Sequence, residues 1–287
     1  DFYIYATKPL SGEIPGFIIS ANSTYPSGYT ASNSRKIGGF HCLCTAIGSA
    51  VYSYYNEGKD AEYINAIFAD GSSITNGSSA HWLNGWAQGD ILPFSCWDLQ
   101  HRPHSDSDVE GRVYNPKTQK WIMIYLPSWS AGLLKSISVY GGAISSGTTS
   151  PAFHFYRWEQ VLANQGESLL SEKDFVSASL GSPQGVNISG SANPVTTGGH
   201  IATDSKRIVS NIGCEDMTGV FWQWSNERGS NTTTAWANAY DANDKNVAGQ
   251  HYSATAAALF GGIWADGAKC GSRGSSWSHS RRVCIGT

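Results

Sequence analysis

The stretch Asn211–Glu227, NIGCEDMTGVFWQWSNE, holds the densest group of residues that restrict the backbone. Asp216 and Gly219 are turn-forming residues, and the aromatic residues after them favour a strand, so the segment predicts a turn that leads into a strand. Trp222 and Trp224 lie two positions apart and belong to the same side of such a strand. We interpret this Trp pair as core packing, which would stiffen the frame around a binding surface.

Two further segments flank this stretch. Residues 168–180 (SLLSEKDFVSASL) contain Ser171 and, three positions later, Asp174, a pattern that resembles a helix-capping box. Residues 257–287 (AALFGGIWADGAKCGSRGSSWSHSRRVCIGT) are rich in Gly, Ser and Trp. The residues between their Gly and Trp positions follow neither a helical nor a two-residue apolar period, so an irregular tail is expected.

The remaining sequence favours an α+β fold. Short apolar runs between residues 2 and 20, and a hairpin-like pair at 112–114 and 121–126, predict strands in the first half. Residues 154–164 and 170–180 carry apolar residues at helical spacing and predict two short helices. The Gly/Ser/Asn-rich segments around them predict long loops that cover a small sheet.

The composition argues against several classes of partner. The net charge is −3, which gives no electrostatic basis for binding a phosphate backbone, so no nucleic-acid partner is expected. No apolar run approaches the roughly twenty residues of a membrane span, so no membrane insertion is expected. Only 14% of residues are charged, with 11 Trp and 32 Gly, and this mixture suits a binding surface of rigid aromatics and adaptable small residues. A loop-rich β domain with Trp in its core is the alternative interpretation.

The six cysteines are spread too thinly for a dense disulfide framework. Cys42 and Cys44 lie two apart in an apolar run beside His41, and we interpret them as buried free thiols. A zinc site is the alternative interpretation, but no second Cys/His pair has suitable ligand spacing.

Taken together, the three segments resemble the formylglycine-generating-enzyme branch of the C-type-lectin fold. The family pattern is a helix start of Leu, an optional Pro, Ser or Thr, and Glu, then Asp-Met-x-Gly-x-x-Trp-x-Trp, then Gly-Gly-x-Trp with an Arg further on. Here Leu170–Glu172, Asp216–Trp224 and Gly261–Trp264, followed by Arg273, occupy those places. The resemblance implies a small twisted antiparallel sheet, two short helices and many long loops.

The chain resembles more closely a subgroup of that branch, the phage tail-tip variable proteins that are diversified by retroelements. The stretches that carry this likeness are 36–44, 90–103, 190–201 and 208–217. It implies a non-catalytic protein of the virion tail tip that binds a host-cell surface receptor, either protein or glycan. An extracellular or cell-surface displayed protein is the alternative location, and a homotrimer is compatible with a fibre tip.

The same resemblance divides the chain into a β-rich part, residues 1–90, packed on a C-type-lectin-fold domain, residues 91–287. The variable binding region would then cover about 259–287. The residues in it that match the subgroup's framework are Gly261, Gly262, Trp264, Gly267, Gly271, Ser272, Arg273, Trp277, Ile285 and Gly286.

The residues between these anchors are the predicted ligand-binding face. They are Ile263, Ala265, Asp266, Ala268, Lys269, Cys270, Gly274, Ser275, Ser276, Ser278, His279, Ser280, Arg281 and Arg282, and Val283 and Cys284 also lie between anchors. Trp236 and Tyr252, which precede the tail, either border this face or pack a loop. The cations make the tail locally basic, which favours an acidic or polar target. An ordinary solvated loop is the alternative interpretation of the whole segment.

The sequence also argues against catalysis. The enzyme branch uses a reactive cysteine pair in the tail, but Asp266 and Gly271 stand near those places and Cys270 has no second thiol close in sequence. Asp106 and Asp108 belong to a small acidic loop that lacks the complete calcium-loop pattern. We therefore predict no catalytic residue, no metal and no cofactor. A formylglycine-generating or hydroxylase-type enzyme and a structural virion decoration protein are the alternatives.

Overall fold

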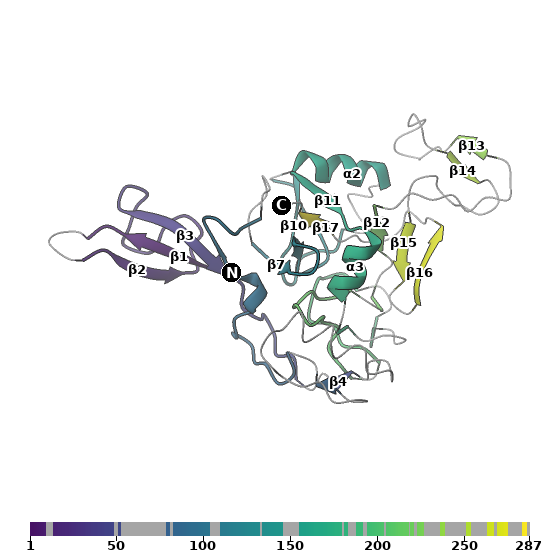
Figure 1. Ribbon diagram of the computed structural model, residues 1–287, viewed down its shortest axis with the longest axis horizontal. Coiled ribbons are helices and arrows are strands. Elements are labelled where there is room, and N and C mark those ends of the chain that lie inside the picture. Colours follow the sequence, from purple (N-terminus) through teal and green to yellow (C-terminus); the bar gives the residue numbers. More distant parts are fainter. Residues whose placement is uncertain are drawn as a thin grey trace.

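The computed structural model consists mostly of short strands, with two short α-helices, in the part of the chain that it describes (Figure 1). That part comprises residues 1–9, 14–48, 51–52, 79–80, 83–103, 110–132, 134–145, 155–179, 181–182, 188–191, 194–203, 205–217, 219–220, 223–226, 236–238, 251–253, 263–266, 269–274 and 283–285. Within these residues, no helix has the length and apolar character needed to cross a bilayer.

An antiparallel sheet at the N-terminus projects from the main body, at the left of Figure 1. Its strand order is β2-β1-β3-β6, formed by β2 (Gly16–Ser20), β1 (Phe2–Thr7), β3 (Ser34–Phe40) and β6 (Trp97–Asp98). Tyr3, Tyr5 and Thr7 are buried while their neighbours on β1 are more exposed, because one face of the sheet is covered and the other is not. The strands predicted between residues 2 and 20 are confirmed.

The main body contains a second antiparallel sheet, with the order β11-β17-β8-β7. Its strands are β11 (Glu167–Leu169), β17 (Val283–Ile285), β8 (Lys120–Met123) and β7 (Arg112–Asn115). The hairpin predicted at 112–126 is confirmed as β7 and β8, and Trp121, Ile122 and Met123 are buried. The strand nearest the C-terminus, β17, thus lies between two strands of the body.

The remaining strands form smaller sheets. The three-stranded sheet has the order β12-β15-β16, with β12 (Gln223–Ser225), β15 (Ile263–Asp266) and β16 (Lys269–Gly274). The pairs are β4 (Val51–Tyr52) with β5 (Ser79–Ala80), β9 (Ser128–Ser130) with β10 (Lys135–Ile137), and β13 (Trp236–Asn238) with β14 (His251–Ser253).

The two predicted helices are confirmed as α2 (Phe155–Asn164) and α3 (Glu172–Ser179). Ser171 begins α3: its Oγ accepts a hydrogen bond from the backbone N–H of Asp174 at 3.0 Å, and its hydroxyl donates to Asp174 Oδ2 at 2.6 Å. Lys120 on β8 lies 2.9 Å from the same carboxylate. Burial opposes ionisation of Asp174, but Ser171 and Lys120 together hold its pKa below the ordinary value. The helix start is therefore fastened to the central sheet.

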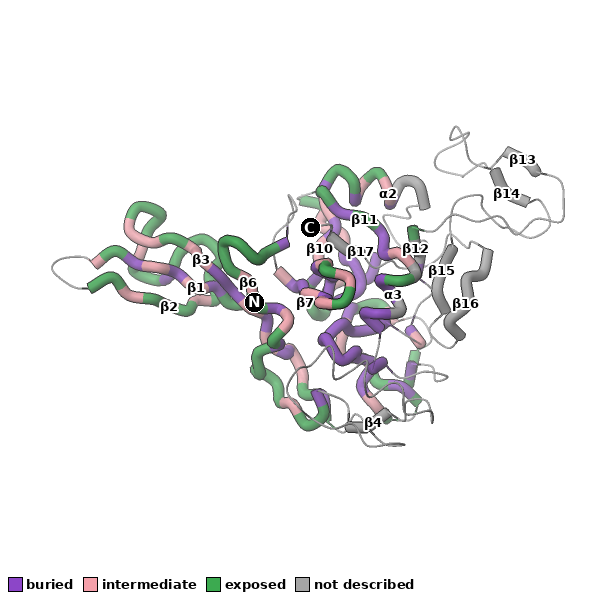
Figure 2. Tube along the Cα trace, viewed as in Figure 1, coloured by how far each residue is buried: buried purple, intermediate pink, exposed green. Residues whose placement is uncertain are grey.

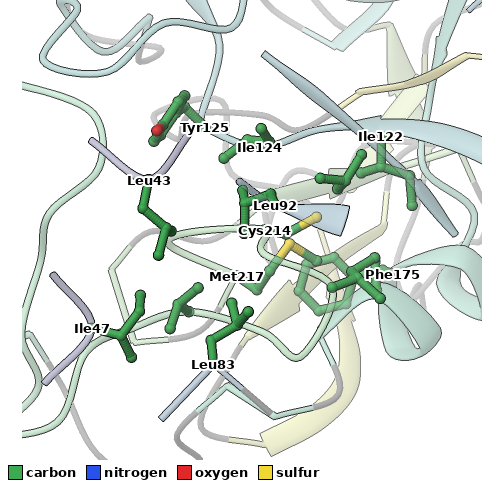
Figure 3. Packing of buried hydrophobic residues seen from close by; sticks show 14 of the residues in the cluster. Leu43, Ile47, Leu83, Leu92, Ile122, Ile124, Tyr125, Phe175, Cys214 and Met217 are labelled. Carbon is green, nitrogen blue, oxygen red and sulfur yellow. The ribbon is translucent and has the colours of Figure 1, made fainter. Parts of the chain in front are cut away.

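One apolar core joins α3, the β7–β8 hairpin and the segment before β12 (Figure 3). Phe175 of α3 and Ile122 of β8 lie in it together with Cys214 and Met217 from the segment 211–217. Buried residues gather in the main body, whereas the strands of the projecting N-terminal sheet carry mainly intermediate and exposed residues (Figure 2). Burying each such large apolar side chain stabilises the fold by about 1.5–3 kcal/mol, so the core fixes where the 211–217 segment lies.

The apolar stretches 37–47 and 90–99 are less regular than strands. Strand β3 ends at Phe40, and Cys42 forms an isolated bridge to Ile91 outside the named strands. Pro93, which has no N–H to donate, begins a short 3₁₀ helix, Pro93–Ser95. Cys42 and Cys44 are free thiols, as predicted. The prediction that they are buried is wrong, because both are half-buried.

Candidate functional site

The turn before β12 is closed by hydrogen bonds to its own backbone. Asp216 has a φ of 61°, a left-handed conformation that Asp tolerates better than most residues. The side-chain amide of Gln223 donates to the carbonyl oxygens of Asp216 at 2.9 Å and Met217 at 3.2 Å. Gln223 is only 1% exposed. The turn predicted from the Asp-Met-x-Gly sequence therefore fixes the position from which β12 starts.

Two neighbouring carboxylates at this turn bind a distant segment, and we call them and their partners the carboxylate network. Asp216 accepts the N–H of Gly198 at 2.9 Å and contacts His200 Nδ1 at 2.8 Å. Glu215 accepts the N–H of Gly199 at 2.6 Å. Burial opposes protonation of His200, but the hydrogen bond and charge of Asp216 outweigh it and raise the pKa of His200.

Arg207 completes the carboxylate network, with its Nη2 2.9 Å from Glu215 Oε1. Each of the four carboxylate oxygens thus lies within 2.9 Å of a nitrogen from another segment. Burial raises the pKa of Glu215, and the guanidinium of Arg207 opposes that shift. Removing one partner would leave a buried charge uncompensated, a change that typically destabilises a fold by about 3–5 kcal/mol.

The Gly198–Gly199 pair lies too close to two tyrosines for any side chain to fit. A Cβ on Gly198 would lie 2.8 Å from the ring of Tyr125 and 2.9 Å from the ring of Tyr140. A Cβ on Gly199 would lie 2.7 Å from the Tyr140 hydroxyl oxygen. Both glycines also have positive φ, 75° and 79°. The stretches 190–201 and 208–217, which carry the family resemblance, therefore contact each other in the fold. The contacts require glycine at 198 and 199 and a carboxylate at 215 and 216.

The sheet that continues from this turn carries much of the predicted variable region. In its register Trp264 lies opposite Trp224 on β12 and opposite Arg273 on β16. Positions directly opposite in antiparallel strands belong to the same face of a sheet. Trp264 and Arg273, both predicted as framework, thus share one face with Trp224, which was predicted to pack in the core.

The other face contains two rows. One is formed by Ser225, Ile263 and Gly274, and the other by Gln223, Ala265 and Ser272. Ile263, Ala265 and Gly274 are predicted ligand-binding residues, so the register separates them from the row Trp224, Trp264 and Arg273. Asp266 and Lys269, also predicted to bind ligand, lie opposite each other beyond a register irregularity.

Beyond β16 the chain returns to the central sheet. Residues 275–282 follow β16 directly, and β17 then pairs with β8 through Cys284↔Ile122 and with β11 through Leu169↔Val283. Both ends of 275–282 are therefore attached to paired strands.

The structure brings the predicted site residues only partly together. Ile263, Ala265, Asp266, Lys269, Cys270 and Gly274 lie on β15 and β16, which form one hairpin. Trp236 and Tyr252 lie on β13 and β14, in neighbouring rows of a separate two-stranded sheet. The predicted residues outside the described part are Ala268, Ser275, Ser276, Ser278, His279, Ser280, Arg281 and Arg282.

Sequence reasoning missed three features of this site. Val283 and Cys284 were grouped with the residues between anchors, yet they belong to β17 inside the central sheet. Two β-branched residues around Cys284 gave a weak strand signal. The roles of Arg207 and Gln223 are not visible in the sequence, because the burial and pairing of a polar residue depend on the groups that pack around it in the fold.

No group of three or more His, Cys, Asp or Glu side chains is placed to hold a metal ion among the described residues. Asp106 and Asp108 of the acidic loop lie outside them, while Glu110 accepts a hydrogen bond from the hydroxyl of Tyr3.

Comparison with known proteins identifies relatives of both ends of the chain. The family model described as "Mtd second domain" matches residues 1–65. A tail fiber receptor-binding protein of Bordetella phage BPP-1 is 27% identical over 274 residues, which cover 90% of this chain. Among solved structures, the major tropism determinant P3c variant aligns with a TM-score of 0.62 and 21% identity over 99% of this chain, and the M1 variant with 0.61 and 22% over 99%.

The chain has the fold of the major tropism determinants. The resemblance to phage tail-tip variable proteins, expected from the sequence, is thereby confirmed. The chain spans 62% of the length of the Bordetella phage relative and 71% of each of the two solved structures. The aligned region covers 99% of this chain, so the likeness of fold is not confined to one part of it.

The packing around Gly198 in this major tropism determinant-like fold is testable with a matched pair of variants. Gly190 also has a positive φ, 87°, but a Cβ there meets no atom within 4 Å. Both Gly→Ala changes incur left-handed strain of about 1–2 kcal/mol, whereas Gly198→Ala also overpacks against Tyr125 and Tyr140, which adds about 1–3 kcal/mol.

The free energy of unfolding in urea should therefore fall further in Gly198→Ala than in Gly190→Ala. Equal losses in the two variants would contradict the contact between Gly198 and the two tyrosine rings.

Proposed function

We propose that this chain is a non-catalytic receptor-binding protein of a phage tail fibre, located at the virion tail tip. The observation that carries the proposal is the attachment of the predicted variable segment: residues 275–282 run between β16 and β17, and β17 is paired on both sides. A segment held at both ends loses less conformational entropy when it binds. The name of the Bordetella phage relative, a tail fiber receptor-binding protein, supports the same activity.

The proposed binding face lies on the hairpin β15–β16 and the residues that follow it, within a variable region of about 259–287. The framework row Trp224, Trp264 and Arg273 would hold one face of the sheet against the body. Ile263, Ala265 and Gly274 belong to the opposite face. Gln223, which belongs to this face, is buried, so a partner could reach Ala265 only if the face is uncovered beyond β12.

The division of the chain into two parts belongs to the same proposal. The domain formed by residues 91–287 would have the C-type-lectin fold, with residues 1–90 as a β-rich part packed on it. The pairing of β3 with β6 supports close association of the two parts, because Gly38 and Gly39 lie opposite Asp98 and Trp97. Display on a cell surface is the alternative location.

The partner would be a protein or glycan on the host-cell surface. Lys269, His279, Arg281 and Arg282 make the segment basic in a chain whose net charge is −3. Charge of this kind steers association more than it sets affinity. An acidic or polar patch on the receptor is therefore the favoured target.

Exchange of the segment between related copies tests the function directly. Residues 263–282 of one copy are replaced by those of a relative with a different host, and β17 is left unchanged because it belongs to the central sheet. We expect binding to whole host cells to follow the donor segment. The matched control is an exchange of residues 21–33, an exposed turn-rich stretch between β2 and β3, which should leave host binding unchanged.

If a folded 263–282 chimera kept the host binding of the recipient, the segment would be a structural decoration and the proposal would be wrong.

The basic character of the tail gives a kinetic prediction. Arg281→Ala with Arg282→Ala should slow association with host cells at low salt by roughly tenfold or less, and the difference should shrink at high salt. The control removes the same charge elsewhere, through Lys8→Ala with Arg35→Ala on the N-terminal sheet. Equal association rates for the two double variants would contradict the proposal that Arg281 and Arg282 steer association with the receptor.

The second partner that we propose is another copy of this chain, in a homotrimer at a fibre tip. The uncovered face of the N-terminal sheet exposes Phe17 by 76% and Ile19 by 60%, and Phe2 stacks on Phe40 beside them. An apolar row of this size on one sheet face suits a contact with another copy of the chain.

Sedimentation of the Phe17→Asp variant tests this contact. The variant should shift the chain toward monomer, whereas Val195→Asp, at a position equally exposed by 76%, should not. A monomeric parent protein, or an unchanged oligomer in Phe17→Asp, would contradict the contact.

A further inference from the structure

A histidine with three side-chain partners lies where the N-terminal sheet joins the body. His41 follows the last residue of β3 and is 4% exposed. Its Nδ1 is 3.1 Å from Asp1 Oδ1, and its Nε2 is 2.9 Å from the hydroxyl oxygen of Tyr125. The same Nε2 lies 3.8 Å from Cys44 Sγ. Carboxylate, imidazole and thiol therefore form a continuous chain of contacts.

The backbone of His41 is held rigidly, so the imidazole is positioned before any reaction. The N–H of His41 donates to the hydroxyl oxygen of Ser95 at 2.7 Å, and its carbonyl oxygen accepts the N–H of Leu92 at 2.9 Å. Ser95 is itself buried. A catalytic or activating base works best when such supporting contacts restrict its orientation.

The hydrogen bonds also determine which ring nitrogen acts as the base. Asp1 Oδ1 accepts the N–H of Gly111 at 3.1 Å and is thus an acceptor toward its other neighbours. Nδ1 of His41 then carries the proton and donates to Asp1, which leaves the lone pair of Nε2 facing Tyr125 and Cys44. An imidazole in this tautomer can take the thiol proton of Cys44, while Asp1 stabilises the imidazolium that results.

The surroundings distinguish Cys44 from the other cysteines whose side chains are described. Burial opposes ionisation of Cys44, but hydrogen bonds with His41 and Tyr125 and the positive charge of a protonated His41 hold its pKa below the ordinary value. Burial raises the pKa of Cys42 and the pKa of Cys96. Cys214 is fully buried in the core.

The groups behind Tyr125 support its role as a neutral donor. Burial and the nearby carboxylate of Glu215 raise the pKa of Tyr125, while the guanidinium of Arg207 opposes that shift. The phenol thus keeps its proton at neutral pH and donates either to Nε2 or to a thiolate.

We propose that Cys44 is a reactive thiol activated by His41, and that it is a site of covalent modification by small soft electrophiles, including peroxides. The proton of the thiol passes to Nε2 of His41. With an alkyl halide, the sulfur forms a bond to carbon as the halide leaves with the bonding pair. With hydrogen peroxide, the sulfur is oxidised to sulfenic acid, and the O–O bond breaks to release hydroxide, which takes the proton from His41 to give water. The proposal uses no residue of 259–287 and does not depend on receptor binding.

The rate of alkylation by iodoacetamide tests the proposal. The full chain is treated across pH 5–10, and the modification of each cysteine is followed by peptide mass spectrometry. Cys44 should react roughly 3- to 10-fold faster than Cys42 and Cys96 at pH 7, because it has the larger thiolate fraction and the lower intrinsic nucleophilicity of such a thiolate only partly offsets this. The midpoint of its pH profile should also lie below theirs.

Two variants separate activation from simple accessibility. Asp1→Asn and Tyr125→Phe each remove one partner of His41 while keeping the size of the side chain, and each should move the Cys44 midpoint to higher pH. Asp90→Asn, which removes a carboxylate near Cys42, is the matched control and should leave that midpoint in place. Cys44 reacting no faster than Cys42 in the parent chain, or an unchanged midpoint in Asp1→Asn, would overturn the proposal even if Tyr125→Phe failed to fold.

Discussion

Glu215 and Asp216 are adjacent, buried and bonded through all four carboxylate oxygens to groups from elsewhere in the chain. Carboxylates removed from water are stable only when donors replace the lost hydration. Here the donors come from Gly198–His200 and from Arg207, so the turn at Asp216 forms together with those segments or not at all. Strand β12 begins seven residues after this turn, and β15 and β16 are added to β12.

The carboxylate network therefore determines where the C-terminal strands lie. Gln223 ties β12 back to the turn, and the register of β15 places Trp264 opposite Trp224. At the other end, β17 is locked between β8 and β11. The strands on both sides of residues 275–282 are thus held by backbone pairing. Backbone pairing does not depend on the identity of the side chains, which is what the proposed variable receptor-binding surface requires.

The parts that the sequence predicted correctly are those with local causes. Ser171 and Asp174 start α3 through contacts three residues apart, and the β7–β8 hairpin follows from a turn between two apolar runs. The position of β17 and the pairing of Arg207 with Glu215 were not predictable in this way. A strand of three residues acquires its place from partners more than a hundred residues away, and a buried ion pair is indistinguishable in sequence from two surface charges. The anchor positions proposed in the tail rest on the family resemblance, because no local pattern indicates them.

The proposed receptor-binding surface requires a backbone that stays fixed while the side chains between the anchors change. A crystal structure of a variant in which Ile263, Ala265, Lys269, Cys270 and 275–282 are all replaced, compared with the parent protein, measures this most directly. We expect an unchanged register of β12, β15, β16 and β17, with the replaced side chains forming one solvent-accessible patch. A shifted register, or residues 263 and 265 enclosed beside Gln223 in the core, would contradict it.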